Sequence, residues 1–205
     1  MSSEEKQALE FMNDFVEGRM TTEQFWERYK SNESIRNLLV NDVTRDHIES
    51  ESMYYFAPER LIEVLDISRL EHKNELYQIV RRYFWRRNES LNFSNSDAEK
   101  YECLLKMLPT WLDVRDEDFL LAIYDSTPSD TSKTEKLKHC KNKVKELFKY
   151  DIKPPRWIQS PEWPIVNGKP LVFKGQSKER EYDERVYFYF YDSDTSEETV
   201  VTQSY

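Results

Sequence analysis

The spacing of hydrophobic residues divides the chain into two parts with different periods. In the first part, apolar residues recur every three to four positions, as Leu9, Met12, Phe15 and Val16 do. That is the period of one face of an α-helix. The pattern predicts a series of amphipathic helices over residues 1 to about 151.

Several of these helices have recognisable start signals. A Ser or Thr followed three residues later by Glu or Gln has the spacing of a capping box. We assign this role to three pairs: Ser2 with Glu5, Thr21 with Gln24, and Ser96 with Glu99. Asp116 is a candidate N-cap for the segment EDFLLAIYD, and residues 133–150 form a Lys-rich amphipathic pattern. Because most of the intervening loops are short, we expect a compact bundle.

The period changes at Lys153-Pro154-Pro155, where proline cannot continue a helix. Three later segments have the pattern of β-strands: PLVFKGQ (170–176), ERVYFYFYD (184–192) and EETVVTQSY (197–205). In the second segment Val186, Phe188 and Phe190 alternate with Tyr187, Tyr189 and Tyr191, so phenylalanines and tyrosines lie on opposite faces. SDTSE between the last two segments fits a hairpin loop.

These patterns predict an α+β protein in two parts. Residues 1–151 are expected to form an N-terminal multi-helix bundle, and residues 152–205 a small C-terminal antiparallel β meander packed on it. Three strands bury too little surface to be stable alone, so one aromatic face needs a partner. The proline-flanked Trp157 and Trp163 are interpreted as anchors of a strap that leads into the sheet, with a ligand-stacking platform as the alternative.

Composition and charge narrow the classes of partner. Of 205 residues, 34% are charged and the formal net charge is −9, with an isoelectric point near 5.0. An excess of acid disfavours general nucleic-acid binding, because phosphate affinity comes from Lys and Arg. It favours a basic partner, whose capture the acidic surface would accelerate.

Residues 81–88, RRYFWRRN, are one basic segment in this acidic chain. Arg81, Arg82, Arg86 and Arg87 alternate with aromatic residues there, a combination that can bind RNA through stacking and phosphate contacts. The competing interpretation places Tyr83 and Phe84 in the core and pairs the arginines with nearby acids.

The residues needed for catalysis or metal binding are few. The histidines are His47, His72 and His139, none of which lies in a known catalytic motif, and two cysteines make neither a disulfide framework nor a zinc motif. DSDTSEE (192–198) begins like a calcium loop but lacks its glycine and final glutamate. We expect no cofactor and no metal, no membrane-spanning segment, and a cytoplasmic location. A hydrolase that uses unrecognised carboxylates is a remaining alternative.

Two stretches resemble known families. The pattern WIQSPEWP…NGKPLVFKGQ…ERVYFYFYD is similar to a C-terminal module of small bacterial cytoplasmic proteins and to segments of the YwqG-like family, whose function is unassigned. FVEGRMTTEQFWERYKSNESIRNLL resembles the helical start of immunity proteins encoded beside polymorphic toxins, including those of contact-dependent growth inhibition. The resemblance implies a toxin-neutralising role and assigns no functional residue.

The leading hypothesis is therefore a non-enzymatic immunity protein that binds a basic toxin domain, a nuclease among the candidates, through an acidic surface with aromatic anchors. The candidate toxin-binding residues form two sets: Asp113, Asp116, Glu117 and Asp118 before and within one helix, and Asp192, Asp194, Glu197 and Glu198 at the hairpin. The alternative is an RNA-associated or regulatory adaptor that uses the Arg81–Arg87 surface.

Overall fold

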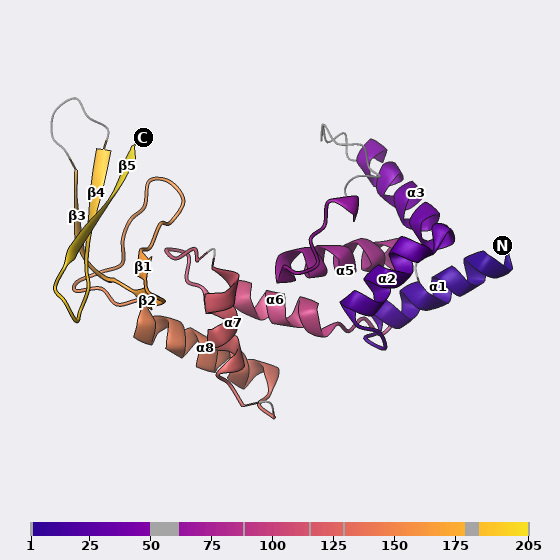
Figure 1. Cartoon of the computed structure of the whole chain (residues 1–205), viewed down its shortest axis with the longest axis horizontal. Helices are drawn as coiled ribbons and strands as arrows, with labels where there is room; N and C mark the ends of the chain where they lie inside the picture. Colours follow the sequence, from indigo (N-terminus) through magenta and orange to yellow (C-terminus); the bar gives the residue numbers. More distant parts are fainter. Residues whose placement is uncertain are drawn as a thin grey trace. The chain divides into compact units, whose positions relative to one another are not determined.

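The computed structural model describes residues 2–49, 62–87, 89–114, 116–128, 130–178 and 185–204, with the backbone alone for residues 43–49. Within these ranges the chain forms seven helices, a three-stranded antiparallel sheet and a two-stranded hairpin (Figure 1). The expected α+β class with a C-terminal β meander is confirmed. The chain divides into two compact units, Met1–Glu102 and Cys103–Tyr205, and the boundary falls inside one helix.

The N-terminal unit is helical. Its elements are α1 (Ser3–Val16), α2 (Thr22–Ser31), α3 (Glu33–Glu49), α5 (Leu70–Trp85) and the first turns of α6 (Ser96–Met107). The core residues are those of the expected helical faces: Met12 and Phe15 of α1, Phe25 of α2 and Leu76 of α5 are fully buried. The rings of Phe15 and Phe25 stack with centroids 4.3 Å apart, which joins α1 to α2.

Two of the three expected capping boxes are present. The side chains of Ser2 and Thr21 accept hydrogen bonds from the third helical residue, whose own side chain accepts from the cap backbone. At α6 the prediction was wrong by one residue. The helix begins at Ser96, and the Oδ1 of Asn95 accepts from the Ala98 amide at 2.9 Å. Asn is at least as good an N-cap as Ser, which explains the shift.

Gly18 ends α1 in the left-handed region, with φ of +73°. A Cβ at this position would lie 2.9 Å from the carbonyl oxygen of Ser94, closer than real Cβ contacts come. The next segment approaches here because the Ser94 amide donates to the Val16 carbonyl at 2.9 Å. Both the backbone angle and the close approach require glycine.

The C-terminal unit combines α7 (Glu117–Asp125) and α8 (Lys133–Leu147) with the strands. The hairpin of β1 (Ile165–Val166) and β2 (Lys169–Pro170) turns through Asn167 and Gly168, both with positive φ, as a type I′ turn requires. The meander follows as β3 (Val172–Lys178), β4 (Arg185–Tyr191) and β5 (Glu198–Ser204), with order β3-β4-β5. The pairing of β3 with β4 is irregular between Phe173 and Gly175, which leaves Lys174 without a register partner.

The inner face of the meander packs on aromatic residues from the helices and the strap. Phe188 and Phe190 are fully buried, and the Trp157 ring lies 4.4 Å from that of Phe188. Trp163 is 6% exposed and contacts both Phe190 and Phe148, with ring centroids 5.3 and 5.5 Å apart. The two tryptophans are therefore packed as strap anchors.

This packing moves the boundary between the units. We expected a helical domain to residue 151, whereas α7 and α8 belong to the same compact unit as the sheet. Phe148, at the end of α8, contacts Phe119 of α7 on one side and Trp163 on the other. The backbone next to it pairs with β3, since the Phe173 amide donates to the Lys149 carbonyl at 2.9 Å. The meander thus shares its compact unit with α7 and α8 and pairs with the segment that follows α8.

Candidate functional site

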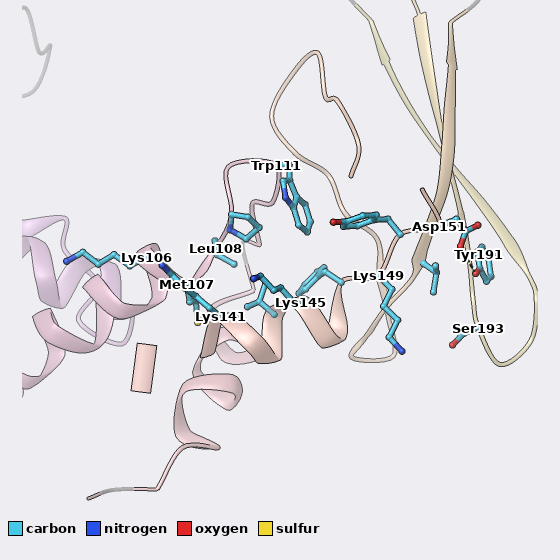
Figure 2. Close-up of a pocket in the computed structure, with 15 residues that line it drawn as sticks. Lys106, Met107, Leu108, Trp111, Lys141, Lys145, Lys149, Asp151, Tyr191 and Ser193 are labelled. Carbon is cyan, nitrogen blue, oxygen red and sulfur yellow. Dashed lines mark hydrogen bonds between the residues drawn. The ribbon is translucent and has the colours of Figure 1, made fainter. Parts of the chain in front are cut away.

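A groove of about 930 Å³ opens in the C-terminal unit (Figure 2). It is bounded by the end of α6 and the turn after it, by α8, and by the sheet end next to the β4–β5 hairpin. Four of the lining residues are lysines: Lys106, Lys141, Lys145 and Lys149. In Figure 2 they follow one another from the α6 end of the groove toward the sheet, with Trp111 facing the middle of the row.

Helix α8 places its lysines at the groove because a row of buried apolar residues and a row of exposed lysines run next to each other along the helix. Val144 and Phe148 are four residues apart and buried, so they fix which side of the helix faces inward. Lys141 and Lys145 are also four residues apart, and they lie on the exposed flank of that side. Neither lysine forms an ion pair within the described part of the chain. Ser132 starts the helix with the third capping box of the structure, which it makes with Glu135.

The wall of the groove contains two aromatic rings. The Trp111 and Tyr150 rings meet edge to face with centroids 5.8 Å apart. Trp111 is fixed in place by the strap, because the Trp157 Nε1 donates to its carbonyl oxygen at 2.8 Å. Tyr150 is 41% exposed. The groove therefore offers a held aromatic ring and a partly free one beside its cations.

Hydrogen-bonding groups line the sheet end of the groove. The Tyr191 hydroxyl donates to the Asp151 carboxylate at 3.1 Å, and this bond to a carboxylate raises the pKa of Tyr191. Ser193 lies at the same end (Figure 2). A ligand along the groove would meet positive charge near α8 and a carboxylate with hydroxyl groups near the sheet.

The outer face of the meander carries a second surface, the tyrosine face: Tyr187, Tyr189 and Tyr191. All three are half-buried, in contrast to the buried phenylalanines on the inner face. Register places Val200, 49% exposed, opposite Tyr189 and Glu198 opposite Tyr191. The Tyr189 hydroxyl lies 3.0 Å from the Ser177 Oγ of β3. The expected alternation of the two faces is confirmed.

The acidic tip comprises the four hairpin residues Asp192, Asp194, Glu197 and Glu198, and it adjoins this face. Three of them have local roles. The Asp192 carboxylate accepts from the amides of Asp194 and Thr195, and these bonds lower its pKa. Asp194 pairs with Lys169 at 2.5 Å, and Glu198 pairs with Lys174 at 2.6 Å. Glu197 is exposed, and its backbone closes the turn with Asp192.

The other acidic set lies before and within the first turn of α7. Asp116 is the N-cap as expected, since its Oδ1 accepts from the Phe119 amide at 2.9 Å. Asp118 and Asp113 are exposed, and Glu117 is half-buried. Acids at a helix start interact favourably with its dipole. Asp116 therefore has a structural role, and Asp118 is an exposed member of the set without that role.

Two of the four arginines of residues 81–87 pair with a buried carboxylate, and the other two line a surface hollow. Arg86 and Arg87 each contact the Asp42 carboxylate at 3.1 Å, and this side chain is only 4% exposed. Arg87 also lies over the Tyr83 ring, 3.4 Å from its centroid. Arg81, Arg82 and Trp85 line a hollow of about 200 Å³, with Trp85 70% exposed. Arg81, Arg82 and Arg87 are therefore exposed, and Arg86 and Arg87 are held by Asp42.

Two of the three histidines have described side chains, and both contact a neighbouring loop. The His72 Nδ1 accepts from the Asp66 amide at 2.9 Å, and the His139 Nε2 lies 3.3 Å from the Ser126 Oγ. His47 lies outside the residues with described side chains. Among the described residues, no three His, Cys, Asp or Glu side chains come together to hold a metal, and no helix there is long and apolar enough to cross a membrane.

Sequence reasoning did not find the groove. It identified the Lys-rich amphipathic helix but gave neither its lysines nor Trp111 a binding role. The signal was the i, i+4 spacing of Lys141 and Lys145 beside the Val144 and Phe148 stripe, which places cations at the edge of a buried face. The turn that carries Trp111 is brought there by the tertiary fold.

Comparison with known proteins leaves function to be argued from these surfaces. No family model, no curated protein and no solved structure matches the chain.

Proposed function

We propose that this chain is a non-enzymatic immunity-type protein that binds and neutralises a basic toxin domain through the tyrosine face and the acidic tip. The observation that carries the proposal is the outward row of Tyr187, Tyr189 and Tyr191, which ends directly at the acidic tip. This arrangement combines aromatic anchors and acidic residues on one sheet. A cytoplasmic location belongs to the same proposal.

The tyrosine face has the chemistry of a protein interface. Tyrosine offers a large apolar ring with a polar end and loses little conformational entropy when it is held, and it is enriched at protein interfaces. Val200 adds exposed apolar area opposite Tyr189. A partner that covers this face would bury rings already held in register by the strands, so little reorganisation is needed on binding.

The acidic tip supplies the selectivity for a basic partner. Three of its carboxylates are held in place by amides or lysines, and Glu197 extends from the turn. Such charges raise the rate of encounter with a positively charged surface and disfavour acidic partners. A toxin that acts on nucleic acid has a basic active site, and covering that site would block its substrate.

A protection assay tests the proposal. Where a gene next to that of the chain encodes a secreted protein with a toxic C-terminal domain, the chain is co-expressed with that domain and cell growth is measured. We expect protection from the wild type and its loss in the double variant Tyr187→Ala/Tyr189→Ala. The matched control is Trp85→Ala, which removes an exposed aromatic ring from the N-terminal unit and should protect fully.

Thermal unfolding of each purified variant separates loss of binding from loss of fold. If the double alanine variant remains folded and still protects, the tyrosine face is not the interface. If the wild type itself fails to protect against that domain, the immunity role is contradicted.

A further inference from the structure

We propose that the lysine-lined groove of the C-terminal unit is a binding site for a nucleotide, with phosphate on the lysines and the base against the Trp111–Tyr150 wall. The groove shares Tyr191 with the tyrosine face, but this proposal rests on the lysines and the aromatic wall and does not depend on the toxin interface. The shared chemistry is a phosphate joined to a ribose and an aromatic base. It can come from a free nucleotide or from one end of a single strand.

Charge is the first argument. The whole chain has a net charge of −9, yet residues 133–149 contain seven lysines and two glutamates. Lys141 and Lys145 line the groove, and Lys106 lies at the same end (Figure 2). A concentration of cations at a concave surface attracts anions locally, since distant acids are screened over a Debye length. Lysine is a common phosphate ligand as a point charge.

The aromatic wall distinguishes a nucleotide from a simple anion. Trp111 is held by the strap, and Tyr150, a residue 41% exposed, meets it edge to face. Base stacking on aromatic side chains is a frequent element of nucleotide binding and tolerates different bases. An acidic peptide would use the lysines but would leave this wall unexplained.

The opposite end of the groove completes the match. Asp151 is the carboxylate of the lining and accepts from the Tyr191 hydroxyl, while Ser193 adds a second hydroxyl. A carboxylate repels phosphate but accepts hydrogen bonds from ribose hydroxyls and base amino groups. Lys149 lies beside Asp151 at this end, whereas Lys141 and Lys145 have no carboxylate in the described lining next to them, so the phosphate is placed toward Lys141 and Lys145. The volume of about 930 Å³ lies within the range of small-ligand sites, about 300–1,000 Å³.

The test is a titration of the full chain, followed by calorimetry and tryptophan fluorescence. The probes are ADP, GDP, CDP and UDP, with inorganic pyrophosphate, a ten-nucleotide oligo-U strand and a ten-residue polyglutamate peptide as comparisons. We expect at least one nucleoside diphosphate to bind with Kd below about 1 mM and to bind at least about tenfold more tightly than pyrophosphate. Comparison of the oligo-U titration with the nucleoside diphosphate titrations distinguishes a site for a free nucleotide from a site for the end of a strand.

Three variants locate the site. Lys141→Gln/Lys145→Gln should weaken binding of the diphosphate at least about tenfold, because two charged contacts are lost. Lys138→Gln/Lys143→Gln makes the same charge change on α8 outside the groove and should alter Kd less than about twofold. Tyr150→Ala should weaken the nucleoside diphosphate but leave pyrophosphate unchanged.

Three results would overturn the proposal. One is the absence of binding by every nucleoside diphosphate and by oligo-U at 1 mM. Another is tight binding of polyglutamate with no nucleotide binding, which would identify an acidic-peptide groove. The third is an equal loss of affinity in the two lysine double variants, which would show a general effect of helix charge.

Discussion

The indole Nε1 of Trp163 donates a hydrogen bond of 2.8 Å to the carbonyl oxygen of Leu171. Both residues are buried, and the bond closes the segment that carries the β1–β2 hairpin. The same ring contacts Trp111, Phe148 and Phe190. A single side chain therefore links the strap, the helices and the sheet of the C-terminal unit.

The first prediction concerns this tryptophan. Trp163→Phe removes the donor, leaves the buried Leu171 carbonyl without it and reduces ring volume, so the free energy of unfolding should fall by about 2–4 kcal/mol. Urea unfolding followed by circular dichroism measures the change. Trp85→Phe, at a side chain 70% exposed, is the control and should change stability by less than about 0.5 kcal/mol. An unchanged free energy of unfolding in Trp163→Phe would contradict the structural role of this tryptophan.

The second prediction concerns the boundary between the units. A fragment of residues 95–205 should unfold cooperatively, because it keeps the packing of Phe119 and Phe148 with Trp163. A fragment of residues 152–205 should show no cooperative transition, since the inner face of its sheet would lose Phe148. Thermal unfolding monitored by near-ultraviolet circular dichroism measures both. A sharp transition in the shorter fragment would restore a boundary at residue 151.

These packing contacts explain how much the sequence could predict. The strands, their two faces and the strap followed from local periodicity and proline positions, because those depend on neighbouring residues. The boundary near residue 151 came from the same local change of period. The predicted boundary differs from the observed one because the residues around Phe148 do not indicate which ring it contacts. That ring is Trp163, not a residue of a helix in the N-terminal unit. The groove was missed for the same reason, since Trp111 and Lys145 meet only in the tertiary fold.

The third prediction concerns the buried carboxylate of Asp42. Its contacts with Arg86 and Arg87 join α3 to the end of α5. Asp42→Ala leaves two arginines without their buried partner and should lower the free energy of unfolding by about 3–5 kcal/mol. Glu27→Ala, which breaks an exposed pair with Lys30, is the control and should cost less than about 1 kcal/mol. Chemical denaturation of both variants measures these changes. Equally small decreases in the free energy of unfolding would argue against a structural role of the buried pair.

The fourth prediction concerns alkaline pH. Burial raises the pKa of Tyr29, Tyr77 and Tyr83, which are all at most 5% exposed. A phenol in the unfolded chain titrates near pH 10, so above that pH the unfolded state loses protons that the native state keeps. The stabilising contribution is complete below the unfolded pKa and is lost as pH rises through the folded pKa.

The variant Tyr77→Phe tests this relationship, because it removes one phenol and keeps the ring. The wild type should lose stability steadily between about pH 9.5 and 11, and the variant should lose less over the same interval. Urea midpoints at several pH values measure both slopes. Comparison at pH 7 shows the effect of the substitution itself. Parallel slopes in the two proteins would contradict the contribution of Tyr77.

The last prediction concerns the rate at which the proposed toxin is captured. Raising salt from about 0.05 to 0.5 M shortens the Debye length from roughly 14 to 4 Å, so long-range attraction is largely screened. We expect the association rate with the toxin domain that the protection assay identifies to fall several-fold, while the dissociation rate changes less. Stopped-flow fluorescence at several salt concentrations gives both rates.

Single charge reversals then choose between the two acidic sets. Asp192 and Asp116 are unsuitable for charge reversal, because their carboxylates accept hydrogen bonds from backbone amides. Loss of these bonds would alter the hairpin turn or the start of α7. Glu197→Lys at the acidic tip and Asp118→Lys in α7 change exposed residues by the same charge. Capture should slow at low salt in Glu197→Lys and change little in Asp118→Lys. The reverse result would place the interface at α7, and rates insensitive to salt and to both reversals would contradict acidic steering.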